Sequence, residues 1–327
     1  MRKVSRREFI RTALIGGIGL AAAPGLLKGS ESGSGVSRIV YVENPAFSKE
    51  MRINPEPLRE AIDSLLMKLT DTNSISEAWK ALLPGYEKGQ VIGIKVNCIN
   101  RWMPSHPEVV HALVESLLEF GVPENDIVIW DRRNDELERK AGYKLNSGQT
   151  GIRCFGTDEP GWGYDAENPV EVGGQTKHLS KIITRLCDHL INVPVLKDHG
   201  LAGVTLSMKN HYGTVENPGT LHGNNCDPFI AELNAVPYIR DKTRLILLDA
   251  ILGICKGGPG GKPQFAPNIL AVGLDPVAMD TFGLKLINEE RKRRGLEEVT
   301  AKAKHIATAA KLGLGTNDES RIKLIRI

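Results

Sequence analysis

The chain has 327 residues, of which 41% are hydrophobic, and its 42 Lys and Arg residues nearly balance its 39 Asp and Glu residues. Residues 1–23 hold five basic residues and one acidic residue, a net +4, so the formal net charge of +3 leaves −1 on the remainder of the chain. A nearly neutral body lacks the basic surface that nucleic-acid binding requires, and we therefore expect no nucleic-acid partner.

The N-terminal segment predicts export. Residues 5–11, SRREFIR, resemble a twin-arginine signal, and an uncharged run at residues 12–23 follows them. Because this run is too short to span a bilayer comfortably, we expect a signal peptide and no permanent membrane span after its removal; the alternatives are a short anchor and a buried helix. The resemblance implies that the twin-arginine translocation machinery exports the folded protein to a periplasmic or other extracytoplasmic location. We assign residues 1–37 to this signal and a Gly/Ser-rich linker, and residues 38–327 to the folded domain.

The first half of the domain predicts alternating strands and helices. Strands are expected at residues 38–42, 91–97 and 127–130, and helices at residues 55–70, 75–83 and 105–120. Alternation places Lys95 and Asn97 on one face at the end of the second strand. Ser105 and Glu108 have the spacing of a capping box at the start of the third helix. Asp131 follows the third strand, where it either binds a ligand or caps the next turn.

Residues 134–180 differ in composition from their surroundings. They are rich in Gly, Asn, Asp and Glu, and short strands are expected only near residues 152–155 and 170–172. We interpret this segment as an insertion in the domain or a lid over a pocket.

The centre of the chain joins a buried strand to a predicted helix. An apolar run at residues 188–196 is typical of a strand covered on both faces, and it ends in the polar sequence KDHG at residues 197–200. Apolar positions then follow at helical spacing from Leu201 to Met208, which predicts an amphipathic helix closed near Gly213. Ligands bind beyond strand ends in open α/β sheets, so Lys197 beside helix amides would favour a carboxylate or a phosphate. Lys209 also suits the C-terminal end of this helix without any ligand.

A second candidate ligand site follows a later strand. Residues 245–249 form an apolar run that ends in Asp249, and the loop KGGPGGK follows at residues 256–262. Glycines let backbone amides approach an anion closely, so this loop is predicted to bind one, although its spacing is not that of a Walker loop. A strand at residues 269–273, a helix capped by Asp275 and further scaffold elements complete the domain.

Three parts of the domain carry a family resemblance. They are LKDHGLAGVTLSMKN at residues 196–210, IKVN at residues 94–97 with SHPEVV at residues 105–110, and DAILG at residues 249–253 with GGPGG at residues 257–261 and LDPVAMD at residues 274–280. Together they resemble the bacterial and archaeal family known as domain of unknown function 362. The resemblance implies no general function, but relatives often carry an appended iron–sulfur ferredoxin module.

The cysteines indicate that this chain lacks such a module. They lie far apart, with no C-x-x-C pair, at Cys98, Cys154, Cys187, Cys226 and Cys255. We therefore expect no iron–sulfur cluster. Mostly buried, unpaired cysteines are favoured over a disulfide framework.

Histidines provide a candidate metal site. His199, His211 and His222 could combine with Cys226 as ligands, but their spacings fit no standard zinc pattern. A metal ion is therefore one alternative, and a mobile rim at residues 214–225 is the other. The sequence specifies no cofactor.

These patterns predict an α/β fold with a largely parallel central sheet flanked by helices. Lys95-x-Asn97 and Lys197-x-His199 each end an apolar strand before a helix, which favours two similar lobes around one crevice. The predicted catalytic residues are His199, Lys197 and Lys95. The predicted ligand-binding residues are Asn97, Lys209, Asn210, Asp131, Asp249, Gly257, Gly258, Gly260 and Gly261.

The functional hypothesis is an exported enzyme that acts on a small anionic substrate. Lysines and backbone amides would hold the negative charge, and His199 would act as general acid or base. The alternatives are a non-catalytic carrier of a metal, cofactor or anion, and an assembly factor that docks another exported protein.

Overall fold

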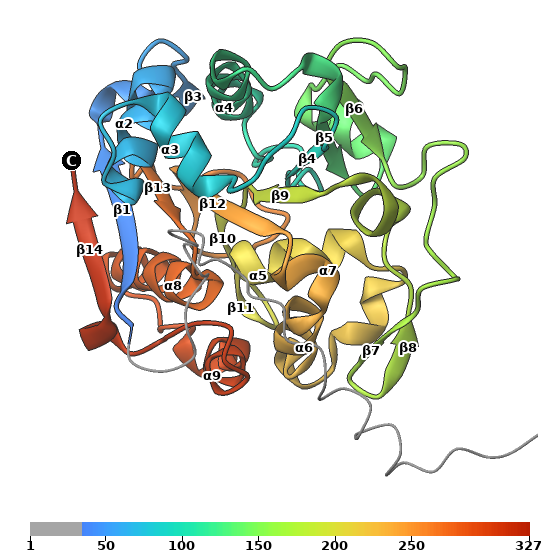
Figure 1. Cartoon of the computed structure of the whole chain (residues 1–327). Coiled ribbons are helices and arrows are strands. Elements are labelled where there is room, and N and C mark those ends of the chain that lie inside the picture. The colour runs from blue at the N-terminus through green and yellow to red at the C-terminus, as the bar shows by residue number, and fades with distance from the viewer. Residues whose placement is uncertain (1–34) are drawn as a thin grey trace, which may run out of the picture.

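The computed structural model describes residues 35–327, and Figure 1 shows a central sheet between two layers of helices. The ten strands run in the order β14 (Ile322–Arg326), β1 (Ser37–Glu43), β13 (Ile269–Gly273), β12 (Thr243–Ile254), β9 (His189–Asn192), β4 (Ile92–Lys95), β5 (Ile127–Asp131) and β6 (Arg153–Gly156), with β10 (Val195–His199) paired to β12 and β11 (Gly203–Thr205) paired to β10. Strands β13 and β11 are antiparallel to their neighbours, and the other pairings are parallel. The predicted α/β fold with a largely parallel sheet is confirmed. The predicted export signal lies outside the described residues.

Helices cover both faces of the sheet (Figure 1). One face carries α2 (Leu58–Thr70), α3 (Ile75–Leu82) and α4 (Pro107–Phe120), and the other carries α5 (Ser207–Asn210), α6 (Phe229–Ala235), α7 (Pro237–Arg240), α8 (Pro276–Arg293) and α9 (Lys304–Lys311). Strand β12 shows why two cores form: Leu245 and Leu247 point into the first, whereas Ile246 and Leu248 point into the second. Among the described residues, no helix is both long and apolar enough to cross a membrane.

The two similar lobes considered from the sequence are parts of one continuous sheet. Strand β4 pairs with β9, with Gly93 opposite Leu190, and β9 pairs with β12. Gly93 is needed at this junction because a Cβ atom there would lie 2.3 Å from Cys187 Sγ. The two Lys-containing strand ends therefore face the same edge of a single sheet.

The central segment turns back on itself before its helix begins. Strands β9 and β10 both pair with β12, and the chain then reverses at Gly200 and returns as β11, antiparallel to β10. The predicted helix from Leu201 was wrong, because α5 begins only at Ser207. Gly203 has a φ of +76°, and the β-branched pair after it forms ladder bonds with β10 instead of a helical turn.

Two other predictions also differ from the structure. Strand β12 continues to Ile254, so Asp249 lies within it and not at its end. The predicted capping box was wrong because His106 is the N-cap of α4, while Ser105 Oγ accepts from Asn97 N at 2.8 Å and donates to Val193 O at 2.6 Å.

Residues 134–180 contribute to the main sheet. Strand β6 is an edge strand parallel to β5, and β7 (Val170–Val172) forms a hairpin with β8 (Gln175–Lys177). Both strands predicted in this segment are therefore present. A second short hairpin joins β2 (Ser48–Lys49) to β3 (Arg52–Ile53).

Candidate functional site

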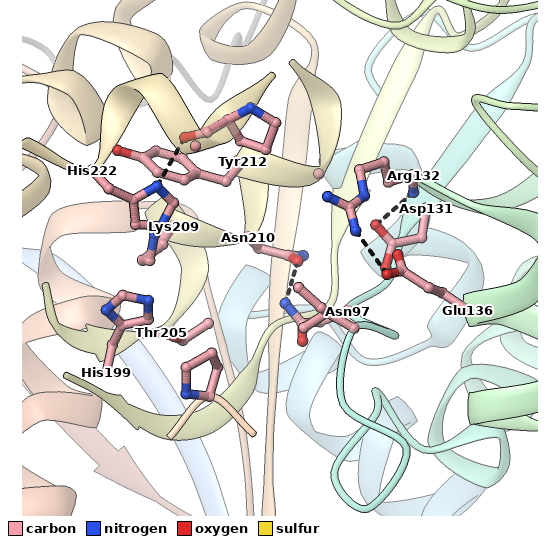
Figure 2. Close-up of a pocket in the computed structure, with 15 residues that line it drawn as sticks. Asn97, Asp131, Arg132, Glu136, His199, Thr205, Lys209, Asn210, Tyr212 and His222 are labelled. Carbon is pink, nitrogen blue, oxygen red and sulfur yellow. Dashed lines mark hydrogen bonds and ion pairs between the residues drawn. The ribbon is translucent and has the colours of Figure 1, made fainter. Parts of the chain in front are cut away.

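A cavity of about 290 Å³ lies beyond the carboxyl ends of β4, β5 and β10 (Figure 2). Its walls are formed by Asn97, Ile99, Asp131, Arg132, Glu136, His199, Thr205, Lys209, Asn210, Tyr212, Gly213, Pro218, Gly219, His222 and Pro259. This volume is at the lower end of the range for small-molecule sites, so the cavity suits a ligand of metabolite size. Six predicted site residues line it, namely Asn97, Asp131, His199, Lys209, Asn210 and the candidate metal ligand His222.

Lys95 and Lys197 lie beneath the floor of the cavity, and both are fully buried. Lys197 Nζ donates to Asn97 Oδ1 at 2.5 Å, and Asn97 Nδ2 donates to Asn210 Oδ1 at 3.0 Å. Lys95 Nζ reaches the same Asn210 oxygen at 3.4 Å. The structure thus brings together the two lysine-bearing strand ends, a hundred residues apart in sequence, through one chain of hydrogen bonds.

The two buried lysines differ in their counter-charges. Lys95 Nζ lies 2.8 Å from Asp131 Oδ1, whereas no carboxylate among residues 35–327 lies within 4.0 Å of Lys197. Burial lowers the pKa of Lys197 to about 8. Neutral acceptors therefore hold this ammonium group, and it adds positive potential beneath the cavity.

Asp131 is held rigidly at the cavity wall. Its Oδ1 accepts from Lys95 Nζ and from Arg132 N, both at 2.8 Å, and its Oδ2 accepts from Cys98 N at 2.7 Å. A Cβ atom on Gly213 would lie 2.6 Å from Asp131 Oδ1 and 2.7 Å from Lys95 Nζ. Both carboxylate oxygens are thus engaged within the protein, and Gly213 leaves the space that the ion pair needs.

His199 faces the cavity in one tautomer. Its Nδ1 accepts from Leu201 N at 3.2 Å and from Ala202 N at 3.0 Å, so the proton of the neutral ring is on Nε2. Burial, reinforced by the charge of Lys209, lowers the pKa of His199 to about 3. This arrangement favours a hydrogen-bond donor at Nε2 over the predicted general acid or base.

Lys209 is a buried cation at the cavity wall with neutral neighbours. Its Nζ lies 3.3 Å from His222 Nε2, 3.6 Å from the ring centroid of Tyr212 and 3.9 Å from Cys226 Sγ. Within residues 35–327, no carboxylate lies within the 4.0 Å of an ion pair. Burial lowers the pKa of Lys209 to about 8. An anionic ligand would supply the missing counter-charge.

Thr205 adds an unsatisfied hydroxyl to the same wall. Thr205 is 5% exposed, and its Oγ1 has no hydrogen-bond partner within the described part of the chain. Figure 2 shows Thr205 beside His199 and Lys209. Sequence reasoning missed Thr205 because it assigned this position to a helix; the β-branched pair after Gly203 was the signal for a strand.

The backbone anion sites expected from the sequence are occupied by carboxylates of the protein. Gly258 N donates to Asp198 Oδ1 at 2.7 Å and Gly257 N donates to Asp198 Oδ2 at 3.2 Å. At the start of α5, the amides of Ser207 and Met208 bind Asp280 at 2.7 and 3.2 Å. The cavity therefore relies on side chains for ligand binding.

The other predicted ligand-binding residues also have partners within the protein or lie off the cavity. Asp249 Oδ2 accepts from His106 Nδ1 at 2.7 Å, and the pKa of His106 is raised by this carboxylate against the opposing effect of burial. Gly261 O accepts from Asn100 Nδ2 at 2.7 Å. Gly260 is not part of the cavity wall, which the glycine loop reaches only through Pro259.

The histidines are only partly gathered. The rings of His199 and His222 lie 5.8 Å apart, whereas His211 is buried away from the cavity wall. Across residues 35–327, no group of three or more His, Cys, Asp or Glu side chains has the arrangement of a metal site. The five cysteines are buried and unpaired, as predicted from their spacing.

Comparison with protein-family models identifies one family. A family model described as "Domain of unknown function (DUF362)" matches residues 92–285, which include the whole cavity wall. No curated protein matches this chain. Among solved structures, the crystal structure of a Thermotoga maritima protein is similar at 12% identity and a TM-score of 0.36, over 83% of this chain and 60% of that one.

Proposed function

The chain belongs to the family described as domain of unknown function 362, and because that description assigns no activity, we propose from the cavity that this protein is an exported enzyme binding a small anionic substrate beside Lys209. The observation that carries the proposal is the buried ammonium group of Lys209, which lines the cavity without a carboxylate partner in the described structure. Buried charges in proteins are normally paired, so a ligand is the natural counter-ion.

The charge around the cavity supports the same conclusion. His199 and His222 are neutral at pH 7 because burial lowers both of their pKa values. Lys95 is paired with Asp131 and Arg132 with Glu136, whereas Lys197 and Lys209 have no carboxylate within 4.0 Å among residues 35–327. This excess of positive charge raises the affinity for a carboxylate or a phosphate.

The donors of the wall suit stabilisation of negative charge during a reaction. Thr205 and His199 lie beside Lys209, and the hydrogen bonds to Nδ1 fix the His199 ring; donors fixed in place stabilise an oxyanion without reorganisation. A lysine with a pKa of about 8 can also exchange a proton near neutral pH. We therefore assign proton transfer to Lys209 and hydrogen-bond donation to His199. Turnover distinguishes this enzyme from a carrier with the same cavity.

Anion affinity should fall as the pH rises through about 8. The anion binds the ammonium form of Lys209, whose pKa of about 8 in the free protein means that this form is lost above that pH. Propionate stays ionised from pH 7 to 9.5, so its affinity should drop about 30-fold over that range. Isothermal titration calorimetry in buffers of different ionisation enthalpy should show proton uptake on binding above pH 8. Affinity that is constant across this range would contradict the assignment of Lys209.

Export should depend on the paired arginines of residues 5–11. Replacing both Arg6 and Arg7 by Lys should retain the precursor in the cytoplasm, because the twin-arginine machinery recognises the pair and not its charge alone. Cell fractionation with immunoblotting measures this, and Arg11→Lys is the matched control that should be exported normally. Normal export of the double variant would exclude this route.

A further inference from the structure

The two walls of the cavity differ in chemistry. Figure 2 shows His199, Thr205 and Lys209 on one side and Arg132 with Glu136 on the other, with Asn97 and Asn210 between them. The first wall presents hydrogen-bond donors to the ligand, as described above. The second wall contains the two carboxylates of the cavity, Asp131 and Glu136.

Glu136 retains one carboxylate oxygen that no described residue satisfies. Its Oε1 accepts from Arg132 Nη2 at 2.8 Å and from Lys140 Nζ at 3.3 Å, whereas Oε2 receives no hydrogen bond from residues 35–327. The residue is 3% exposed and lines the cavity. Both Asp131 oxygens, in contrast, are occupied. Oε2 itself is not fully buried, so this oxygen is open at the cavity wall, where a donor on the ligand can reach it and form a charge-assisted hydrogen bond.

The floor between the walls offers no competing site for that donor. Asn97 Oδ1 accepts from Lys197 Nζ, and Asn210 Oδ1 accepts from Asn97 Nδ2. Asn210 Nδ2 donates to Asn192 Oδ1 at 2.7 Å, which fixes the orientation of its amide. The hydrogen-bonding groups of Asn97 and Asn210 named here already have partners within the protein, so they do not compete with Glu136 for a donor on the ligand.

A neutral hydroxyl group suits this position better than an amine. Glu136 already lies beside the guanidinium group of Arg132 and the ammonium group of Lys140. A third cation at this point would meet both positive charges, whereas a hydroxyl group makes the charge-assisted hydrogen bond without that repulsion. Glu136 also begins a π-helical turn, Glu136–Ala141, an irregularity that is concentrated at functional sites.

We propose that the substrate is a small hydroxy acid, whose anionic group binds Lys209, Thr205 and His199 and whose hydroxyl group donates to Glu136 Oε2. This inference rests on the proposed function and adds the chemical class of the substrate. Glu136 is thus a specificity-determining residue.

Matched ligand series on the full chain test the proposal. Propionate, 3-hydroxypropionate and 3-aminopropionate differ only at the far end, and butyrate with its 4-hydroxy and 4-amino analogues extends the series by one carbon. In at least one of the two series, the hydroxy acid should bind about tenfold or more tightly than the unsubstituted acid, and the amino acid should bind no better than the unsubstituted acid. Calorimetric titrations at pH 7 give these ratios without any variant.

The Glu136→Gln variant sharpens the test. It should reduce the preference for the hydroxy acid to about threefold or less, while the unsubstituted acid binds equally or more tightly because a negative charge has been removed. The exposed Glu138→Gln, from the same turn, is the matched control and should keep the wild-type ratio. Equal binding of all three acids in both series, or a preference for the amine, overturns this inference and leaves anion binding intact. Binding of none of these acids also overturns this inference, and it contradicts the proposed function itself when inorganic phosphate fails to bind as well.

Discussion

Replacing Asp131 by Asn should lower the free energy of unfolding by about 3–5 kcal/mol, because it leaves the buried ammonium group of Lys95 without a counter-charge. Lys95 is fully buried and Asp131 is 4% exposed, with 2.8 Å between Nζ and Oδ1. The remaining acceptors for Lys95 Nζ are Val96 O at 2.7 Å and Asn210 Oδ1 at 3.4 Å, and these neutral oxygens cannot replace a carboxylate. Urea denaturation at pH 7 measures the loss.

The matched control is Asp135→Asn, which removes a partner of Arg133 near the surface. The side chain of Arg133 is 52% exposed, so solvent screens this pair and the cost should stay below about 1 kcal/mol. The double variant Lys95→Met with Asp131→Asn should be more stable than Asp131→Asn alone, since it removes the orphaned cation. Equal, small losses for Asp131→Asn and Asp135→Asn would contradict the structural role of the Lys95 pair.

The sequence predicted the sheet well because its parallel strands are buried on both faces. Such a strand is a continuous apolar run, as at residues 127–130, and it ends where polar residues begin. Because parallel strands end at one edge, the convergence of Lys95, Asn97 and Lys197 could be predicted without knowing any contact.

The hairpin before α5 could not be predicted by periodicity. Positions from Leu201 to Met208 have helical spacing, yet Leu201 is 46% exposed and the residues after Gly203 pair with β10. Tertiary pairing overrode the local pattern, and this moved Thr205 from a helix face to the cavity wall.

The binding of the Asp198 carboxylate by the glycine loop could not be predicted, because the two segments are distant in sequence. Gly258 and Asp198 are 60 residues apart, and a Cβ atom on Gly258 would lie 2.0 Å from Asp198 O. A glycine that lets a backbone approach a ligand and one that lets a backbone approach another strand look the same in sequence. The position of Glu136 at the cavity wall likewise follows from the path of the chain after β5.

Replacing Lys209 by Gln should weaken anion binding at pH 7 by about 2 kcal/mol or more, roughly 30-fold, because a charge-assisted contact in a buried site is lost. The same change should leave stability equal or higher. The folded protein lowers the pKa of Lys209 from 10.5 to about 8, so folding disfavours its charged form below that pH. A residue that weakens the fold while strengthening ligand binding is characteristic of a functional site. Thermal unfolding of both proteins without ligand tests this second part.

Anion binding at Lys209 is best measured by calorimetric titration of propionate and of inorganic phosphate into the wild type, Lys209→Gln and Lys311→Gln at pH 7. Lys311 is exposed at the end of α9, so its substitution removes the same charge far from the cavity. We expect that at least one of the two anions binds the wild type and Lys311→Gln equally, with the roughly 30-fold loss confined to Lys209→Gln. Absence of binding to the wild type, or equal binding by all three proteins, would contradict it.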